Sequence, residues 1–260
     1  MLAELGAAVA RVGEKILDCR ARGQIQGTWR GTQFKAEADL IADDSLRSEL
    51  RRIADIDIVS EEDVASQRPR RLPEYWLIDP IDGTASFAGG YSGFVCQAAL
   101  VHDAQVQMSA VCAPAMHRLY LAQVGKGASL NSEPLRVRAG SEGDVVLVDN
   151  YPQPRGIAER LYRGLPCARY LESGSIGLKI CLVADGTADL FVKDVAVRDW
   201  DVAAPALILT EAGGALRRFD NQEFLLDGDY EKTGLIAAAS PRLLDAVAAF
   251  ANPPRGTHDD

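Results

Sequence analysis

The chain has 260 residues, of which 47% are hydrophobic and 25% are charged, a balance typical of a globular protein that is long enough to bury a large core. Its formal net charge of -9 argues against a nucleic-acid polymer as partner, because proteins that bind one normally carry a basic excess or a basic stripe. The five cysteines are scattered and form no C-x-x-C pair, which predicts free thiols in a reducing cytoplasm.

The chain begins without a signal-peptide pattern, and its longest apolar stretches are too short to cross a bilayer, so we expect a cytoplasmic protein without a membrane partner. Apolar residues spaced by three and four predict an amphipathic helix from Leu2 that ends near Gly23. A loop of roughly ten residues should follow, and then a second helix over about 38–54. Asp39 lies three residues before the first apolar position of that second helix, so its carboxylate points toward the buried face.

The pattern then changes to strands, which we predict at 56–59, 75–78, 94–101, 105–112 and 119–124. Two of these strands lead into acidic segments that we interpret as turns. Ser60-Glu61-Glu62 follows the first strand, and Asp79-Pro80-Ile81-Asp82-Gly83-Thr84 follows the second. Functional groups tend to gather beyond the carboxyl ends of strands, so both turns are candidates for a site.

Strands and helices alternate in the second half of the chain. Strands are expected at 145–149, 188–193, 215–219 and 235–238, and helices at 156–164, from Ser175 to Gly186, at 201–212 and from Pro241. We therefore predict an α+β fold with an N-terminal α+β subdomain (1–140) that carries the acidic turns. A C-terminal α/β subdomain (141–252) and a flexible tail (253–260) should follow.

The pair Asp79 and Asp82 is the strongest chemical signal. Two carboxylates three residues apart, in a turn stiffened by Pro80, cannot both be ionised at low cost unless a cation lies between them. Hard oxygen ligands favour magnesium, calcium or manganese. Gly83 and Thr84 would present N–H groups and a hydroxyl beside such a cation, which suits a phosphate.

These residues resemble a known family. Asp79-Pro80-Ile81-Asp82-Gly83-Thr84 resembles the signature of the inositol monophosphatase superfamily, which includes 3'(2'),5'-bisphosphate nucleotidases, histidinol-phosphate phosphatases and fructose-1,6-bisphosphatases. Ser60-Glu61-Glu62 resembles its upstream acidic motif, and Trp200-Asp201 with the following 211–214 resembles its C-terminal signature. The resemblance spans residues 1–240 and implies a layered αβαβα sandwich of the inositol monophosphatase and sugar phosphatase type.

The resemblance also implies a Mg²⁺-dependent phosphatase that hydrolyses a small phosphate monoester with a metal-activated water and no covalent intermediate. Two or three Mg²⁺ ions per site are expected, together with inhibition by lithium, and members of the family often form homodimers. The implied metal ligands are Glu61, Asp79, the carbonyl of Ile81, Asp82 and Asp201. The implied catalytic residues are Asp39 and Thr84, which orient and deprotonate the water, and Glu61, which also supports a weaker third ion. The implied substrate-binding residues are Gly83, Thr84, Ala85, Ser175 and Lys179.

The substrate stays open at this level. Ser60 and the segment 174–179 resemble the bisphosphate nucleotidases, in which Lys179 would contact a second phosphate or a nucleotide, whereas 210–214 resembles the inositol phosphatases. Histidinol phosphate and fructose 1,6-bisphosphate are further alternatives. Ala36 stands where the family usually has a threonine, so the loop before Asp39 and the third metal site are expected to differ. A catalytically degenerate, metabolite-binding protein is the alternative from another functional class.

Overall fold

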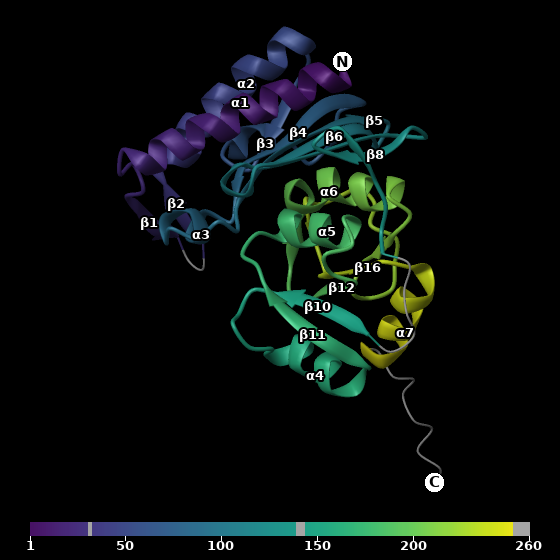
Figure 1. Cartoon of the computed structure of the whole chain (residues 1–260). Coiled ribbons are helices and arrows are strands. Elements are labelled where there is room, and N and C mark those ends of the chain that lie inside the picture. The colour runs from purple at the N-terminus through teal and green to yellow at the C-terminus, as the bar shows by residue number, and fades with distance from the viewer. Residues whose placement is uncertain (31–32, 139–143, 252–260) are drawn as a thin grey trace.

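The computed structural model of the chain describes residues 1–30, 33–138 and 144–251. Five alternating layers of helix and sheet make up the molecule, and Figure 1 shows them edge-on. This arrangement confirms the expected αβαβα sandwich. The helices are α1 (Leu2–Ala21), α2 (Glu37–Ile53), α3 (Thr84–Ala88), α4 (Gly156–Gly164), α5 (Ile176–Ala184), α6 (Asp199–Glu211) and α7 (Pro241–Ala251), with 3-10 turns at Val64–Ser66 and Pro114–Met116.

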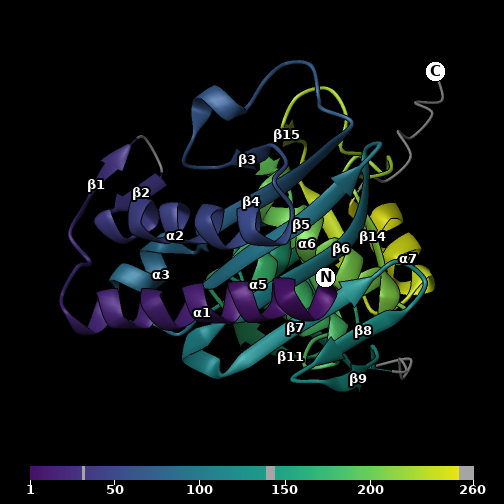
Figure 2. The ribbon, with the colours of Figure 1, turned by 90° about the horizontal axis from the view of Figure 1, so that it is seen from above.

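A seven-stranded sheet forms the second layer, beneath α1 and α2 (Figures 1 and 2). Its order is β3-β4-β5-β6-β7-β8-β9, with β3 parallel to β4 and the other neighbours antiparallel. Leu5 and Val9 of α1 and Leu46 of α2 pack in one buried cluster with Ile78 of the sheet, as their helical spacing requires. The strands are β3 (Ile58–Ser60), β4 (Glu74–Asp82), β5 (Val95–His102), β6 (Gln105–Ala113), β7 (Arg118–Gln123), β8 (Gly127–Leu130) and β9 (Glu133–Leu135).

A five-stranded sheet forms the fourth layer, in the order β11-β10-β12-β16-β14. β10 runs parallel to β11 and β12, and β16 is antiparallel to both of its neighbours. Helices α4 and α7 cover its outer face (Figure 1). The strands are β10 (Val145–Asp149), β11 (Cys167–Glu172), β12 (Leu190–Lys193), β14 (Ala215–Arg217) and β16 (Leu235–Ala238), and two small sheets pair β1 (Gly27–Arg30) with β2 (Gln33–Ala36) and β13 (Val197–Arg198) with β15 (Glu231–Lys232).

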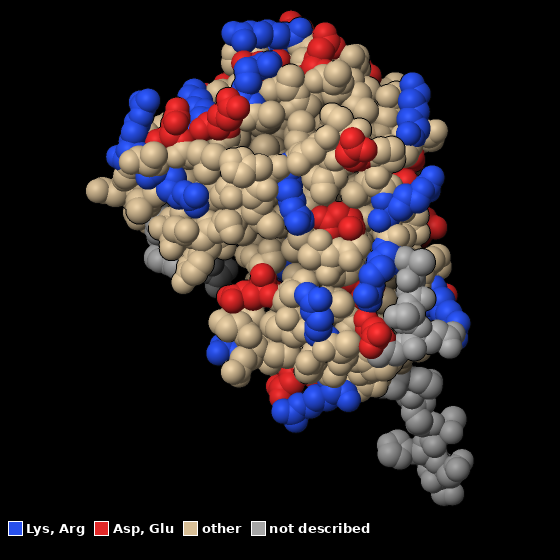
Figure 3. Space-filling model, viewed as in Figure 1, with Lys and Arg blue, Asp and Glu red and all other residues tan. Residues whose placement is uncertain are grey.

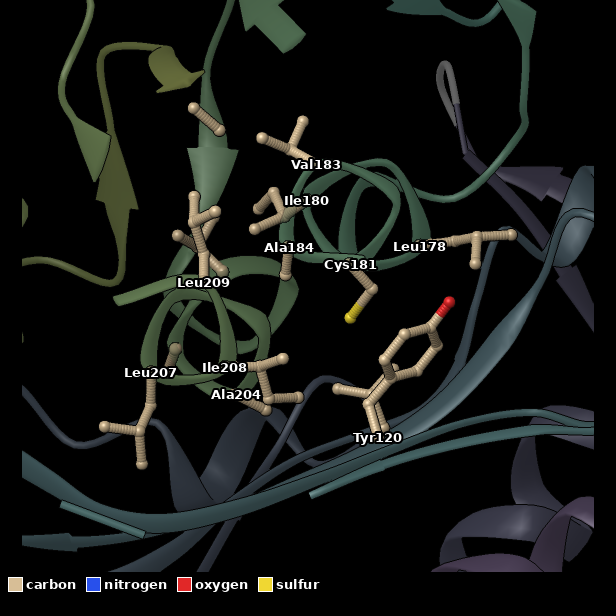
Figure 4. Packing of buried hydrophobic residues seen from close by; sticks show 14 of the residues in the cluster. Tyr120, Leu178, Ile180, Cys181, Val183, Ala184, Ala204, Leu207, Ile208 and Leu209 are labelled. Carbon is tan, nitrogen blue, oxygen red and sulfur yellow. The ribbon is translucent and has the colours of Figure 1, made fainter. Parts of the chain in front are cut away.

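Helices α5 and α6 lie between the two sheets. Residues 177–184 of α5 are all buried, and apart from Lys179 they are glycine or apolar, as a helix packed on every side requires. Figure 4 shows Cys181 of α5 and Ile208 of α6 beside Tyr120 of the seven-stranded sheet. One buried cluster thus joins both sheets, and the division into subdomains at residue 140 stays a prediction. That boundary and the predicted tail at 253–260 lie outside the described residues.

The predicted loop after α1 is wrong in part, since the structure forms the hairpin β1–β2 there. Cross-strand pairing satisfies backbone hydrogen bonds of β1 and β2 that a loop would leave to water. The predicted turn at 79–82 is also wrong, because β4 continues to Asp82. Its register against β5 shifts between Asp79 and Asp82, which is where a strand tolerates a residue such as Pro80. Strands β8, β9 and β11 had no clear alternation in the sequence and were not predicted.

The helices among the described residues lack the length and apolar composition that crossing a membrane requires. Basic and acidic side chains are interspersed on the face of the molecule seen in Figure 3.

Candidate active site

Three acids from two elements meet at the edge of the second layer. Asp79 and Asp82 lie near the end of β4, and Asp201 lies in the first turn of α6. One carboxylate oxygen from each lies within 4.8 Å of the other two. Asp79 and Asp82 are buried, at 1% and 8% exposure, while Asp201 is half-buried. Hard oxygens at this spacing suit a cation such as Mg²⁺ or Mn²⁺.

Glu61 lies at the margin of this group. It follows β3, the parallel neighbour of β4, and its loop is held by Gln67, whose Nε2 donates to the Ser60 carbonyl at 2.9 Å. Glu61 is not among the residues whose oxygens lie within 4.8 Å of one another. Its charge nevertheless contributes to the raised pKa of Asp201. A ligand in this position would complete the site from one side, and the predicted role of Glu61 stays a prediction.

Two of the acids have raised pKa values. Burial raises the pKa of Asp82, although hydrogen bonds from Ser175 and Gly177 oppose the shift. Burial raises the pKa of Asp201 well above its usual range, and the charges of Asp82 and Glu61 raise it further. Like charges in a buried cluster hold protons unless a cation compensates them. The donor set therefore fits a divalent cation both in ligand type and in electrostatics.

Asp82 is held by the start of α5. Its Oδ2 accepts hydrogen bonds from Ser175 Oγ at 2.5 Å and from the Gly177 N–H at 2.6 Å. Ser175 Oγ also accepts the Leu178 N–H at 2.9 Å, so the same hydroxyl caps the helix. A Cβ on Gly177 would stand 3.1 Å from Asp82 Oδ2 and 2.6 Å from Gln97 Oε1. Glycine is therefore what lets the helix approach the acid this closely.

Asp39 and Thr84 form the second group of the site. Thr84 Oγ1 lies 3.0 Å from Asp39 Oδ1 and 3.0 Å from the Ile81 carbonyl. Asp39 Oδ2 accepts the Ala36 N–H at 2.6 Å, and the Asp39 side chain is 1% exposed. A hydroxyl that donates to a carboxylate keeps its lone pairs for a proton from water. Because the backbone N–H of Ala36 holds Asp39, the missing threonine hydroxyl leaves this pair in place.

The first turn of α3 adjoins the same corner. Gly83 precedes the helix with a φ of 91°, which favours glycine, and a Cβ there would stand 2.8 Å from the Gly93 carbonyl. The N–H groups of Thr84 and Ala85 belong to the first helical turn, where no carbonyl of the same helix can accept them. Their expected contact with a phosphate oxygen stays a prediction.

Lys179 and Ser175 are placed differently from what a substrate contact requires. Lys179 is fully buried, and its ammonium donates to the Asn150 side chain, to the Gly174 carbonyl at 2.9 Å and to the Ser173 carbonyl at 3.3 Å. Burial, helped by the charge of Lys193, lowers the pKa of Lys179 to about 7. Ser175 is also fully buried. This geometry favours a structural role for both side chains, which hold neighbouring segments together, over the contacts with substrate that the resemblance implied.

Two supporting residues escaped the sequence analysis. Arg71 forms an ion pair with the buried Asp199 and stacks over Tyr230, with 3.7 Å between its guanidinium and the ring centroid. This pair joins the loop after Glu61 to the first residue of α6, which begins two residues before the predicted start at Asp201. Gln97 Nε2 donates to the Trp200 carbonyl at 2.9 Å. Both contacts join segments that are far apart in sequence, so no local sequence pattern predicts them.

Comparison with known proteins gives the same family. The model of the inositol monophosphatase family matches residues 2–252. A Thermotoga maritima protein named fructose-1,6-bisphosphatase/inositol-1-monophosphatase is 33% identical over 208 residues, which cover 77% of this chain and 78% of that protein. The Nus factor SuhB of Pasteurella multocida is 28% identical over 235 residues, covering 87% and 85%.

The fold has close solved counterparts. The structure of an IMPase from Thermotoga maritima superimposes with a TM-score of 0.80 at 24% identity, covering 95% of this chain and 94% of that one. At this identity the likeness concerns the fold alone, whereas the family match covers nearly the whole chain. The chain therefore belongs to the inositol monophosphatase family.

Proposed function

We propose that the protein is a Mg²⁺-dependent phosphatase that hydrolyses a small phosphate monoester. The observation that carries the proposal is the meeting of Asp79, Asp82 and Asp201 within 4.8 Å, next to the Asp39–Thr84 pair. Clustered carboxylates with raised pKa values are costly in a fold that has no use for them. The family match supports the phosphatase class, and the donor set supports the metal.

The metal ions would be held by four carboxylates and one backbone carbonyl. Asp79, Asp82, Asp201, the Ile81 carbonyl and Glu61 would hold two or three Mg²⁺ ions. Bound magnesium supplies positive charge to the phosphoryl oxygens and to the leaving oxygen, and it makes a coordinated water acidic.

Thr84 accepts the proton of the attacking water and passes its own hydroxyl proton toward Asp39, which the 3.0 Å contact permits. The N–H groups of Gly83, Thr84 and Ala85 hold the phosphate in line with that water. Because water is the nucleophile, no covalent intermediate on the protein is required.

A polyol or sugar phosphate is the proposed substrate class. The name of the Thermotoga maritima relative supports it, since that name gives fructose 1,6-bisphosphate and inositol 1-phosphate as substrates. The case for a 3'(2'),5'-bisphosphate nucleotide relied partly on Lys179 as a contact for a second phosphate. The ammonium of Lys179 is instead committed to three oxygens of the protein, which weakens that alternative.

Release of inorganic phosphate from four substrates tests the proposal: inositol 1-phosphate, fructose 1,6-bisphosphate, 3'-phosphoadenosine 5'-phosphate and histidinol phosphate. We expect turnover with Mg²⁺, none with a chelator, inhibition by lithium, and the highest kcat/KM on one of the first two. Asp82→Asn, which removes a ligand charge, is the matched control and should be inactive. Equal phosphate release by Asp82→Asn, or release unaffected by the chelator, would refute the metal-dependent mechanism.

A second candidate is a non-catalytic binding protein. The name of the Pasteurella multocida relative, a Nus factor, is the observation in its favour. The presence of every acid of the proposed mechanism favours the enzyme. If no substrate is turned over although Mg²⁺ binds, the binding protein becomes the better assignment.

A further inference from the structure

Gln97 is a polar residue on the apolar inner face of β5. Its neighbours on that face, Val95, Ala99 and Val101, belong to the cluster that packs against α5 and α6. Gln97 is fully buried. Its Nε2 donates to the Trp200 carbonyl at 2.9 Å, but its Oε1 has no hydrogen-bond partner among the described residues. An orphaned buried acceptor costs about 1–3 kcal/mol, so this oxygen calls for a donor.

The orientation of the amide is determined by its surroundings. If oxygen and nitrogen were exchanged, two carbonyl oxygens, those of Gln97 and Trp200, would face each other without a proton between them. The hydrogen bond to Trp200 therefore requires Nε2 on that side. The carbonyl oxygen Oε1 must then point the other way, toward α5 and the end of β4.

That direction leads to the three acids. Gln97 is the cross-strand partner of Asp79, and directly paired side chains lie on the same face of a sheet, with Cβ atoms about 5 Å apart. The position that a Cβ of Gly177 would take lies 2.6 Å from Gln97 Oε1 and 3.1 Å from Asp82 Oδ2, so these two oxygens are neighbours. Through Trp200, the same side chain also reaches the residue before Asp201.

Ionised carboxylates cannot donate a hydrogen bond to this oxygen. A water molecule held by a cation between the acids can, since metal-bound water is a strong donor and metal sites are commonly completed by such outer contacts. We propose that Gln97 is a positioning residue of the cation site. Its Oε1 accepts a hydrogen bond from a water bound at the three acids, and its Nε2 fixes the start of α6. This inference rests on the cation site of the proposed function.

Affinity for Mn²⁺, measured without substrate by titration calorimetry or electron paramagnetic resonance, tests it. Gln97→Met keeps the length of the side chain and removes both contacts. We expect about a 10-fold or greater loss of affinity, the range found for other outer-sphere partners. Ser109→Ala is the matched control. Ser109 on β6 also has a fully buried oxygen that has no hydrogen-bond partner among the described residues. Its cross-strand partner on β5 is Ala99 and not one of the acids. Its affinity should equal that of the wild type.

The outcomes separate the two proposals. If the wild type binds no Mn²⁺, the cation site itself fails and this inference fails with it. If folded Gln97→Met has a lower melting temperature but unchanged affinity, Gln97 is only structural and the proposed function stands. Should Gln97→Met not fold, a crystal structure of the wild type with Mn²⁺ decides. A metal-bound water within hydrogen-bond distance of Oε1 is expected, and an Oε1 without such a water overturns the inference.

Discussion

Ser175 Oγ donates a 2.5 Å hydrogen bond to Asp82 Oδ2 across 93 positions of sequence. The same hydroxyl accepts the Leu178 N–H and so caps α5. One side chain thus fixes both the end of β4 and the start of a helix from the other half of the chain. A carboxylate at the first turn of a helix is also stabilised by the partial positive charge of that helix end.

Replacing Ser175 should therefore affect stability and activity together. Ser175→Ala removes a helix cap, which costs about 0.5–2 kcal/mol of unfolding free energy, and it frees Asp82 to move. We expect this loss of stability and about a 10-fold lower affinity for Mg²⁺, measured by denaturation and by activity against Mg²⁺ concentration. Ser240 caps α7 through the Leu243 N–H and does not contact the acids. Ser240→Ala should show the loss of stability alone, and equal effects on Mg²⁺ affinity would contradict the prediction.

Neutralising Asp201 should separate stability from function. Its Oδ2 accepts the Arg198 N–H at 2.8 Å, which an asparagine oxygen can also do, while the repulsion from Asp82 and Glu61 disappears. Asp201→Asn is expected to raise the melting temperature of the metal-free protein and to lower kcat/KM by more than about 100-fold. Calorimetry and phosphate release measure the two effects.

The same substitution at Asp185 should have the opposite effect on stability. Its Oδ2 accepts hydrogen bonds at 2.7 Å from Arg118 and from the Tyr120 hydroxyl, so its charge is compensated. Asp185→Asn should destabilise the protein by about 1–3 kcal/mol. A metal-free Asp201→Asn that melts below the wild type would mean that the three acids do not repel one another.

Asp39 and Thr84 should act as one unit. Thr84→Val removes the hydroxyl of the 3.0 Å contact, and Asp39→Asn removes the negative charge that receives the proton. Each is expected to lower kcat by about 100-fold or more. The double variant should be little worse than either single one, because groups that serve one step are not additive. Thr84→Ser keeps the hydroxyl and should retain most of the activity. Fully additive losses in steady-state kinetics would assign the two residues to separate tasks.

Lys179 should make stability depend on pH. Its pKa is about 7 in the folded protein against 10.5 for an ordinary lysine, so between these values the unfolded chain binds a proton that the folded protein does not. The free energy of unfolding should therefore rise with pH across this window, and the gain should be lost as pH falls through 7. Urea denaturation of the metal-free protein at several pH values measures the slope. Lys179→Met should reduce the slope, and an unchanged slope would assign it to other groups.

The sequence was most informative where chemistry is local. The motif around Asp79 and Asp82 pointed to a metal site, and the amphipathic spacing located α1 and α2. Other features depend on which segments meet in space. These are the position of Glu61 outside the group of three acids, the burial of the Lys179 ammonium and the contact of Gln97 with Trp200. Lysine and glutamine are usually exposed, so only the packing of α5 and α6 between two sheets reveals that these side chains are buried.

Two of the three clustered acids lie on β4 and the third lies on α6, so nearly half of the chain separates them in sequence. A nascent polypeptide cannot offer a place for the cation until α6 has docked beneath the first sheet. An ion bound there would stabilise only the finished molecule. Shortage of divalent cations would then leave a larger share of newly made copies open to proteases, even before any substrate is encountered.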